Sequence, residues 1–567
     1  MIVSLFTEFA RRLTDWRTLL KIAGTGASGL MLAASFPGLF GAEPGGWYAW
    51  AALAPLILVA SHAAPRRAFM WGMAAGTLFW LIGISWLLKL TGTSPTPWPW
   101  IVLGWVFLAC YSALYTGAFA MVASFWIRAW GTANILRNTV MTFGFAAVWV
   151  GFEYLRGLLF TGYPWNPLGV SQYRNIAVIQ VAEWWGVYGV SAMIALINAG
   201  IAIAINKHLN HEPGTRRYRP HPEIYLAAIL VLVAVCQFGP LRARRYTSQV
   251  TNLRVAVVQP AIPQDQKWED EDATRRHIVD RLRDLSRIGL AAEERPDLLV
   301  WPETSTPDCL RDTNGVTRAM VAELMTNGVP LLAGSLDYEH VGGRYRYYNS
   351  AILIDGSNHI VTTYAKQHLV PVGEYIPLAG IFPILDRLAP FGWTCSAGTT
   401  PTVFTIRHGV DGAVLICFED AFPGLARQFV RRGARLLINM TNDAWFDISE
   451  GSRQHLAHFV FRCVENRVAG VRAANTGISC FIDRNGQVYE TLAAGPGGAP
   501  LAGTLNSGVF VPAAGAEPLT FYTRHGDRYF ALPCAIFALT MLVLAAVKTR
   551  PGVGTTGQAA NDGGWHV

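Results

Sequence analysis

Hydrophobic residues follow two different patterns along the chain. Up to about residue 240, and again near the C-terminus, apolar stretches approach the roughly 20 residues that a helix needs to cross about 30 Å of hydrocarbon. Between these regions, short β-rich runs alternate with amphipathic helical stretches. We therefore predict an α-helical membrane bundle of about eight transmembrane helices, with an α/β domain inserted before the last helix. The apolar stretches span residues 20–40, 47–60, 69–88, 100–127, 140–160, 187–205, 224–238 and 529–547.

The positions of the basic residues predict how the bundle is oriented. Lys and Arg collect at alternate ends of the apolar stretches, and short loops rich in these residues stay on the cytoplasmic side. Both termini are therefore predicted to be cytoplasmic, with the inserted domain on the opposite side. Arg242, Arg244 and Arg245 oppose this topology, but the rule is weaker beside a long translocated domain. The residues that set the orientation are Arg11, Arg12, Arg17, Arg66, Arg67, Arg128, Arg137, Lys207, Arg216, Arg217, Arg219, Lys548 and Arg550.

Composition favours a membrane protein and argues against several other classes. Hydrophobic residues make up 52% of the 567 residues and charged residues 15%, against about 25% charged in soluble domains. The 20 tryptophans agree with this, because Trp collects at lipid interfaces. The net charge of +8 comes mostly from residues that flank apolar stretches, so no nucleic-acid partner is predicted. The eight cysteines include no CxxC pair, so we expect no metal site, disulfide framework or cofactor.

The same patterns predict where the domains begin and end. Residues 1–20 mix charged and apolar side chains and are predicted to form an interfacial amphipathic segment, not a cleavable signal. Transmembrane helices 1–7 occupy residues 21–242, the soluble domain residues 253–512, and transmembrane helix 8 residues 528–548. The cytoplasmic tail, 549–567, is rich in Gly, Thr and Asn and is predicted to be disordered.

The soluble block alternates predicted strands with predicted helices. Amphipathic helical stretches lie at 273–290, 425–432 and 453–467. This alternation is typical of a layered α/β domain made in one piece. The predicted strands are 253–258, 298–301, 331–336, 350–354, 360–364, 403–406, 414–417, 436–440 and 478–482.

Ionisable residues stand at the ends of three of these strands. Glu303, Lys366 and Cys417 each follow an apolar run. Cys417 is placed where a strand turns into an acidic helix start, and helix N–H groups there favour a thiolate. The alternative is a packed core cysteine, since free Cys is among the most buried residue types. If the three strand ends converge at one sheet edge, a carboxylate, an amine and a thiol meet where α/β folds commonly place chemistry.

The sequence around these residues resembles a known family. Glu303 in WPET, Lys366 in YAKQHLVPVGEYIP and Cys417 in ICFED resemble the Glu-Lys-Cys triad of the nitrilase (carbon-nitrogen hydrolase) superfamily. The similarity covers about 253–511, including VVQP near its start and NMTNDAW after the cysteine, and implies a nitrilase-like αββα sandwich. With the flanking helices and the GYPW segment, the chain resembles the membrane-bound apolipoprotein N-acyltransferase family. Phe418 stands where some members have Tyr, which keeps an aromatic ring.

The resemblance implies a two-step acyl transfer that completes bacterial lipoprotein maturation. Cys417 takes an acyl chain from a phospholipid, with phosphatidylethanolamine as the expected donor, and holds it as a thioester. The α-amine of an N-terminal diacylglyceryl-cysteine on an apolipoprotein is the acceptor. The implied location is the bacterial inner membrane, with the catalytic domain on the periplasmic side. The protein is expected to work as a monomer.

The resemblance also implies the roles of individual residues. Glu303 is the general base and acid, and Lys366 stabilises the oxyanion. Glu374 and Glu419 are supporting residues that hold the lysine and the substrate amine.

Several aromatic and apolar segments are candidate substrate contacts. Trp268 resembles a loop aromatic at the substrate entrance, and Trp165 lies in the GYPW segment. The nearby Glu153 and Arg156 either form a local ion pair among interfacial aromatic anchors or contact substrate. The apolar arm 376–393 either dips toward acyl chains or packs against the bundle.

Two other functions are compatible with these residues. A membrane-tethered amidase that hydrolyses a small C–N substrate would use the same triad, because the triad does not by itself choose water or amine as acceptor. A non-catalytic sensor could bind lipid or peptide through a nitrilase-like domain. The complete triad argues against the sensor, and the extensive helices argue against the amidase.

Overall fold

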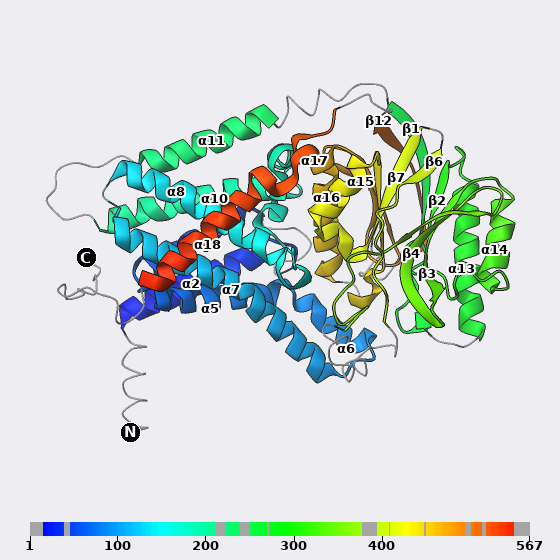
Figure 1. Ribbon diagram of the computed structural model, residues 1–567, viewed down its shortest axis with the longest axis horizontal. Coiled ribbons are helices and arrows are strands. Elements are labelled where there is room, and N and C mark those ends of the chain that lie inside the picture. The colour runs from blue at the N-terminus through cyan, green and yellow to red at the C-terminus, as the bar shows by residue number, and fades with distance from the viewer. Residues whose placement is uncertain are drawn as a thin grey trace.

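The computed structural model describes residues 15–38, 46–132, 134–210, 221–238, 250–268, 272–376, 394–407, 409–446, 449–493, 501–512 and 518–548. Most of the predicted interfacial segment, the apolar arm beyond Ile376 and the cytoplasmic tail lie outside these residues. The molecule has two parts that pack against each other, a bundle of helices and an α/β domain (Figure 1).

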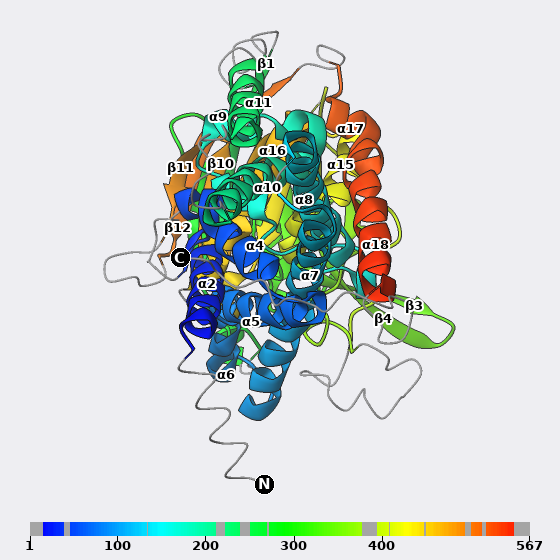
Figure 2. The same ribbon diagram turned by 90° about the vertical axis from the view of Figure 1, so that its left-hand side faces the viewer.

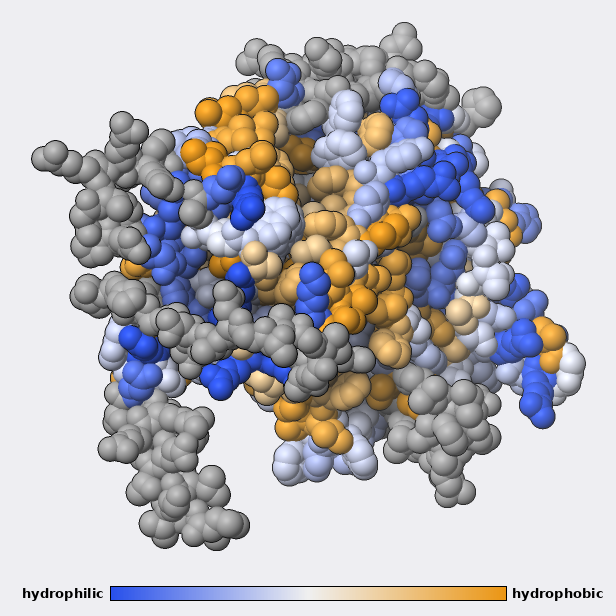
Figure 3. All heavy atoms as spheres, turned by 60° about the vertical axis from the view of Figure 1, so that its left-hand side comes forward, coloured by the Kyte–Doolittle hydropathy of each residue, from blue (hydrophilic) through white to orange (hydrophobic). Residues whose placement is uncertain are grey.

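Apolar helices form the bundle, because in lipid a helix satisfies all of its backbone hydrogen bonds internally. Small residues let neighbouring helices approach closely: a Cβ on Gly72 would lie 2.7 Å from Ala120 Cβ. Large apolar side chains such as Phe107 and Ile536 are more than half exposed on its surface (Figure 3). Two helices lie at its periphery, α11 and α18 (Figure 2). The helices are α2 (Trp16–Ala34), α3 (Ala49–Ala52), α4 (Ala54–Ser61), α5 (Pro65–Gly83), α6 (Leu90–Thr93), α7 (Trp98–Trp130), α8 (Ile135–Arg156), α9 (Ile176–Ile179), α10 (Ala182–Leu209), α11 (Pro222–Phe238), α17 (Phe521–His525) and α18 (Ala531–Lys548).

Judged by their length and composition, fewer helices are able to span a membrane than the sequence pattern predicts. Among the described residues, 4 helices are long and apolar enough to cross a membrane: α7, α8, α10 and the helix Phe521–Lys548. The pair Pro65–Gly83 and Ser85–Thr93 adds a fifth if it forms one span, bent by 49°. Two further apolar helices, Gly46–Ser61 and Pro222–Gln237, are shorter. The predicted count of eight is therefore not confirmed, because apolar runs do not reveal where a helix bends or stops.

Two six-stranded sheets form the centre of the described α/β domain. Their strand orders are β12-β1-β2-β3-β4-β5 and β11-β10-β9-β8-β7-β6, with parallel pairs at the centre and antiparallel pairs toward the edges. The strands are β1 (Val250–Gln259), β2 (Leu298–Val300), β3 (Leu331–Val341), β4 (Arg344–Ile354), β5 (Ile360–Ala365), β6 (Phe404–Arg407), β7 (Val410–Ile416), β8 (Leu436–Thr441), β9 (Ala469–Ala474), β10 (Ser479–Ile482), β11 (Val488–Leu492) and β12 (Gly503–Pro512).

The sheets face each other and carry helices on their outer faces (Figure 1). Successive side chains of β1 point to opposite faces of its sheet, and both faces are apolar. Val255 and Val257 join the core between the sheets, while Ala256 and Val258 join a separate core under the helices. The first sheet is covered by α13 (Asp272–Leu290) and α14 (Val316–Met325), and the second by α15 (Pro423–Arg431) and α16 (Glu450–Asn466). The predicted layered α/β domain is therefore confirmed.

Three strands were not predicted, β9, β11 and β12. β9 has the sequence AGVRAA, whose small residues and arginine lack the β-branched and aromatic signal of a strand. The sequences of β11 and β12 are interrupted by polar residues and glycines, because these strands are less buried. Tertiary pairing, not local preference, makes these segments strands.

The bundle and the α/β domain are joined through α16, which is buried along nearly its whole length. The Gln454 side chain lies at this junction and is 1% exposed. Its Oε1 accepts hydrogen bonds from Trp86 Nε1 at 3.1 Å, Trp165 Nε1 at 2.8 Å and Asn166 Nδ2 at 3.1 Å. Its Nε2 donates to the carbonyl oxygens of Pro37 and Gly83, both at 2.9 Å. A single amide of the α/β domain thus binds several segments of the bundle.

Candidate active site

Cys417 occupies a tight turn at the end of β7. The strand is apolar and buried up to Ile416, and a short 3₁₀ helix, Cys417–Ala421, follows at once. Cys417 has a φ of 53°, a region that non-glycine residues rarely adopt. Asn439 stabilises the turn, because its Nδ2 donates to the Leu415 carbonyl at 3.0 Å and to the Cys417 carbonyl at 3.4 Å. Such strain at a buried thiol is typical of a functional position.

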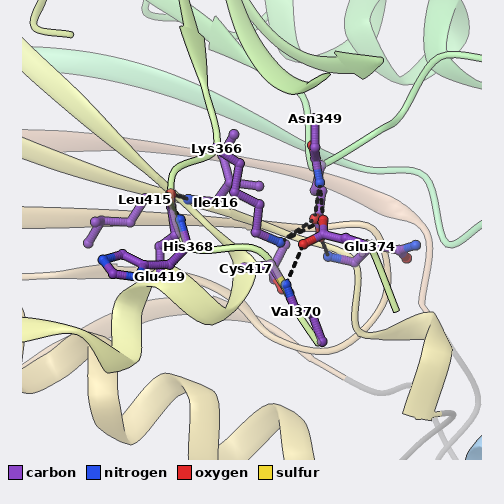
Figure 4. Close-up of polar contacts among 12 residues, drawn as sticks. Asn349, Lys366, His368, Val370, Glu374, Leu415, Ile416, Cys417 and Glu419 are labelled. Atoms are coloured by element: carbon purple, nitrogen blue, oxygen red, sulfur yellow. Dashed lines mark hydrogen bonds and ion pairs between the residues drawn. The ribbon is translucent and has the colours of Figure 1, made fainter. Parts of the chain in front are cut away.

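Lys366 lies beside Cys417 and between two carboxylates (Figure 4). Its Nζ is 2.9 Å from Glu374 Oε1 and 3.5 Å from Glu303 Oε1. Lys366 directly follows β5, and Glu303 lies in the loop after β2, so both come from the first sheet, whereas Cys417 comes from the second. The three side chains therefore meet between two facing sheets, and the expectation of a single sheet edge is wrong.

Two asparagines that the sequence analysis missed fix the carboxylates. Asn349 on β4 donates from Nδ2 to Glu303 Oε1 at 2.7 Å and to Glu374 Oε1 at 2.8 Å. The backbone N–H of Asn442 donates to Glu303 Oε2 at 2.8 Å. Both oxygens of Glu303 are thus held in place. Asn349 stands where β4 changes from an exposed, tyrosine- and arginine-rich half to a buried, apolar half, and no local pattern marks it.

Glu419 is fully buried and binds backbone, not the lysine amine. Its Oε1 accepts from Tyr364 Oη at 2.8 Å, Gln367 N at 2.7 Å and His368 N at 3.1 Å, and its Oε2 accepts from Ile416 N at 2.8 Å. Burial raises the pKa of Glu419 to about 7. The carboxylate joins the chain after Lys366 to the end of β7, so it sets the distance between amine and thiol. Glu374 binds Lys366 directly, which matches the role implied by the family resemblance.

The electrostatic environment of the thiol differs from the sequence expectation. Burial, and then the charge of Glu303, raise the pKa of Cys417, while Lys366 and His455 lower it. Helix N–H groups were predicted to favour a thiolate at Cys417, and burial, the largest influence on its pKa, acts against that tendency. Burial lowers the pKa of Lys366, but Glu374 and Glu303 more than offset this and leave it well above its ordinary value. The lysine is a permanent cation beside a thiol that needs a base.

A second buried lysine, Lys267, also lies at the site. Its Nζ donates to the backbone carbonyl of Glu303 at 3.1 Å. Burial lowers its pKa to about 7, although Glu303 and Cys417 favour the cation. Lys267 was not predicted, because it lies in a polar loop with no strand-end pattern. It fixes the backbone that carries the candidate base.

Beneath Cys417 lies a buried network of charged groups. His455 Nδ1 is 3.1 Å from Asp420 Oδ2, and the His455 side chain lies close enough to Cys417 to lower the pKa of the thiol. Arg472 NH1 is 3.4 Å from Asp420 Oδ2, and Arg472 NH2 is 2.9 Å from Asp443 Oδ2. All of these side chains except that of Cys417 are at most 3% exposed. No local sequence pattern marks His455, because its partners Asp420 and Cys417 come from another element.

The predicted substrate contacts have different surroundings. Trp165 is 1% exposed and packs against Phe418, with ring centroids 6.0 Å apart, so it supports the aromatic residue next to Cys417. Trp268 ends a short 3₁₀ helix, Gln266–Trp268, and its side chain is outside the described structure. Glu153 and Arg156 bind the loop that holds Trp165: Glu153 Oε1 accepts from Leu168 N at 2.6 Å, and Arg156 NH1 donates to Trp165 O at 2.7 Å.

A groove of about 970 Å³ opens between the bundle and the α/β domain. Its bundle side includes residues 88–93 and 173–176, and its domain side includes Gln264, Ala444 and Thr476. Gln264 Oε1 accepts from Asn442 Nδ2 at 2.8 Å, and Asn442 binds Glu303, so the groove lies close to the triad. Two buried groups that belong to groove-lining residues, Gln264 Nε2 and Thr476 Oγ1, have no hydrogen-bond partner within the described structure.

Comparisons with known proteins match both parts of the chain. Residues 28–200 match the family model of the apolipoprotein N-acyltransferase N-terminal domain, and residues 254–499 match that of carbon-nitrogen hydrolases. The apolipoprotein N-acyltransferase of Geobacter metallireducens is 36% identical over 525 residues, which are 91% of this chain and 94% of that protein. The apolipoprotein N-acyltransferase of Brucella melitensis is 34% identical over 70% of this chain and 71% of that protein. Among solved structures, Saccharomyces cerevisiae Nit3 of the nitrilase superfamily has a TM-score of 0.35 and 16% identity, and covers 46% of this chain and 90% of its own.

Proposed function

Because this chain belongs to the apolipoprotein N-acyltransferase family, it is a membrane N-acyltransferase that acylates lipoproteins, and we propose that Cys417 carries the acyl group between the two substrates. It uses a lipid acyl donor and a lipoprotein acceptor. The alternatives of a small-molecule amidase and a non-catalytic sensor are not favoured by these relatives. The main support for Cys417 as the carrier is its convergence with Lys366 and Glu303 in one buried site.

Acylation begins with attack of the Cys417 sulfur on an ester carbonyl of a phospholipid, for which phosphatidylethanolamine is our candidate. Because burial keeps the thiol protonated, a base must take its proton, and Glu303 is the carboxylate whose charge acts most strongly on it. The S–C bond forms, and Glu303 then returns the proton to the leaving glycerol oxygen as the C–O bond breaks. The product of this step is a thioester.

The oxyanion of each tetrahedral intermediate is stabilised by Lys366. The amine is a permanent cation in a buried site, where a charge acts far more strongly than in water. Glu374 and Asn349 prevent a short ion pair between the Lys366 amine and Glu303. Lys366 Nζ is 2.9 Å from Glu374 Oε1 but 3.5 Å from Glu303 Oε1. Glu303 therefore stays available as a base.

The second step transfers the acyl chain to the α-amine of an N-terminal diacylglyceryl-cysteine. Glu303 takes a proton from the attacking amine, the C–N bond forms, and the Cys417 thiolate leaves. We assign the acceptor to the groove between bundle and domain. Gln264 Nε2 and Thr476 Oγ1, which lack partners within the described structure, suit the carbonyl and N–H groups of a peptide backbone.

Both substrates are anchored in lipid, so we place the catalytic domain at the outer surface of a bacterial inner membrane. In this topology about eight helices span the membrane, both termini are cytoplasmic and the protein works as a monomer. Alkaline phosphatase inserted at Gly342, in the exposed turn between β3 and β4, should be active in cells. An inactive, cytoplasmic reporter in a stably expressed fusion would reverse the proposed orientation.

The thioester is tested by mass spectrometry of the purified protein after incubation with phosphatidylethanolamine but no acceptor. We expect the mass of one acyl chain on Cys417, stable in water and discharged by a diacylated peptide with a free N-terminal amine. Cys417→Ser should lose the adduct, whereas Cys309→Ser, which changes a half-buried thiol elsewhere, should keep it. An adduct that persists in folded Cys417→Ser would place the nucleophile elsewhere. Rapid discharge by water alone would favour a hydrolase.

A further inference from the structure

His455 is placed between the candidate nucleophile and a buried carboxylate. Nδ1 lies 3.2 and 3.1 Å from the two oxygens of Asp420, which follows Cys417 by three residues on the same short helix, so Nε2 is the ring nitrogen left to interact with the Cys417 side chain. The imidazole is 2% exposed. Its ring also packs edge-on against Trp165, with centroids 4.8 Å apart, which fixes the plane in which both nitrogens point.

The charges around Asp420 favour a protonated His455. Arg472 is a buried cation placed between two buried carboxylates, Asp420 and Asp443. One guanidinium offsets only one of the two negative charges, and an uncompensated charge is costly in a buried site. An imidazolium at His455 offsets the other charge while making a charge-assisted hydrogen bond to Asp420.

We propose that His455 is a further catalytic residue, an imidazolium that donates a hydrogen bond from Nε2 to the Cys417 sulfur and stabilises it as a thiolate. The sulfur carries negative charge twice, when it attacks the phospholipid ester and when it leaves the thioester. A fixed cation at hydrogen-bond distance lowers the free energy of both transition states. Lys366 serves the carbonyl oxygen and His455 serves the sulfur, so each developing charge has its own cation.

His455 exchanges no proton in this scheme. Both of its nitrogens already carry hydrogen, so it cannot act as the base, and that role stays with Glu303. Burial lowers the pKa of His455, but Asp420 more than offsets this and raises it to about 10. The imidazole therefore keeps its charge across the range in which the enzyme is assayed.

The groups that face His455 come from several elements. Asp420 and Cys417 lie on the 3₁₀ helix after β7, and Arg472 reaches Asp420 from β9. On α16 itself the neighbouring titratable group is His458. Burial keeps the pKa of His458 well below its ordinary value, and the positive charges of Arg462 and Arg156 lower it further. His458 is thus a neutral histidine on the same helix and offers a matched control.

The test measures the thiol directly, by the rate at which iodoacetamide alkylates Cys417 between pH 6 and 11.5 in the full-length protein in detergent micelles. Alkylation follows the thiolate fraction. Removing the imidazolium in His455→Gln raises the thiol pKa, so we expect the midpoint to move up by about one pH unit or more. At pH 7 this lowers the rate about tenfold for each unit. Asp420→Asn should shift the midpoint in the same direction, because His455 loses the carboxylate that keeps it charged.

His458→Gln should leave the midpoint unchanged, although it lies on the same helix and its Nε2 accepts from Asn166 N at 3.2 Å. An unchanged midpoint in folded His455→Gln or Asp420→Asn would overturn the proposal. If neither variant folds, the wild-type protein decides: hydrogen–deuterium exchange at the ring carbon of His455, read by mass spectrometry, follows the protonation of that ring alone. A ring that stays protonated to pH 8 supports the proposal, and one that titrates near pH 6.5 overturns it.

The role of His455 rests on Cys417 being the acyl carrier, but the two are tested separately. Alkylation reports the protonation of the thiol whether or not acyl transfer occurs. A missing acyl adduct with a shifted midpoint would reject the carrier alone. A normal adduct with an unshifted midpoint would reject the histidine alone.

Discussion

Replacing Gln454 by Leu should weaken the junction between the bundle and the α/β domain. The substitution keeps a side chain of similar size at a position that is 1% exposed, and it removes five hydrogen bonds of 2.8–3.1 Å. The groups left without this partner are three N–H donors, from two tryptophans and an asparagine, and two backbone carbonyls. None of them can reach bulk water without opening the junction.

The cost follows from the usual net value of a buried hydrogen bond. At about 1 kcal/mol for each bond, five bonds give about 5 kcal/mol. The carbonyl oxygens lose less than the N–H donors, and leucine adds apolar contact, so we expect about 3–5 kcal/mol. A domain of this size loses about 2–4 °C in Tm for each kcal/mol, which predicts a fall of about 10 °C.

Thermal melting in detergent micelles, followed by tryptophan fluorescence, measures this effect. Gln454→Glu should lower the Tm at least as much, because a carboxylate still accepts from Trp86, Trp165 and Asn166 but cannot donate to the two carbonyls and buries a negative charge. Gln428→Leu is the control, since Gln428 is exposed on α15, and surface changes usually cost less than about 0.5 kcal/mol. If Gln454→Leu has the same Tm as Gln428→Leu, the Gln454 side chain does not hold the bundle and the α/β domain together.

Two further substitutions probe the site itself. Thr476→Val removes a hydroxyl that has no partner within the described structure, so it should leave the Tm unchanged and raise KM for the diacylated peptide about fivefold, the value of one lost hydrogen bond. Slower acyl-enzyme formation in single-turnover assays would instead assign the groove to the phospholipid. Glu374→Gln removes the carboxylate 2.9 Å from Lys366, so the amine should turn to Glu303 and weaken it as a base. Acyl-enzyme formation should fall about a hundredfold, and an unchanged rate would contradict the role of Glu374.

The sequence reveals the parts of the fold that depend on local pattern. Apolar alternation located most strands, and the ionisable residues at strand ends drew attention to Glu303, Lys366 and Cys417. The two facing sheets were implied by the resemblance to the nitrilase superfamily and not by local pattern, because strand ends look alike whichever sheet they belong to. A single sheet edge was therefore the wrong geometry.

The rest of the site depends on residues that only tertiary structure explains. Arg472 lies in a strand whose sequence is poor in strand formers, and its charge is understood only with Asp420 and Asp443 beside it. Asn349 lies where β4 changes from exposed to buried, and only the two carboxylates to which it donates explain its presence. The effect of burial on the pKa of Cys417 is of the same kind, since the depth of burial cannot be read from a run of apolar residues.

The placement of Gln454 and His455 next to each other on α16 has a consequence for the role of the membrane half. One residue anchors the α/β domain to the bundle, and the next faces the nucleophile. Trp165 of the bundle donates to Gln454 and packs its ring against His455, so the contact that joins the two halves also orders the ring beside the thiol. The membrane half therefore contributes to the order of the reaction centre as well as to the binding of lipid.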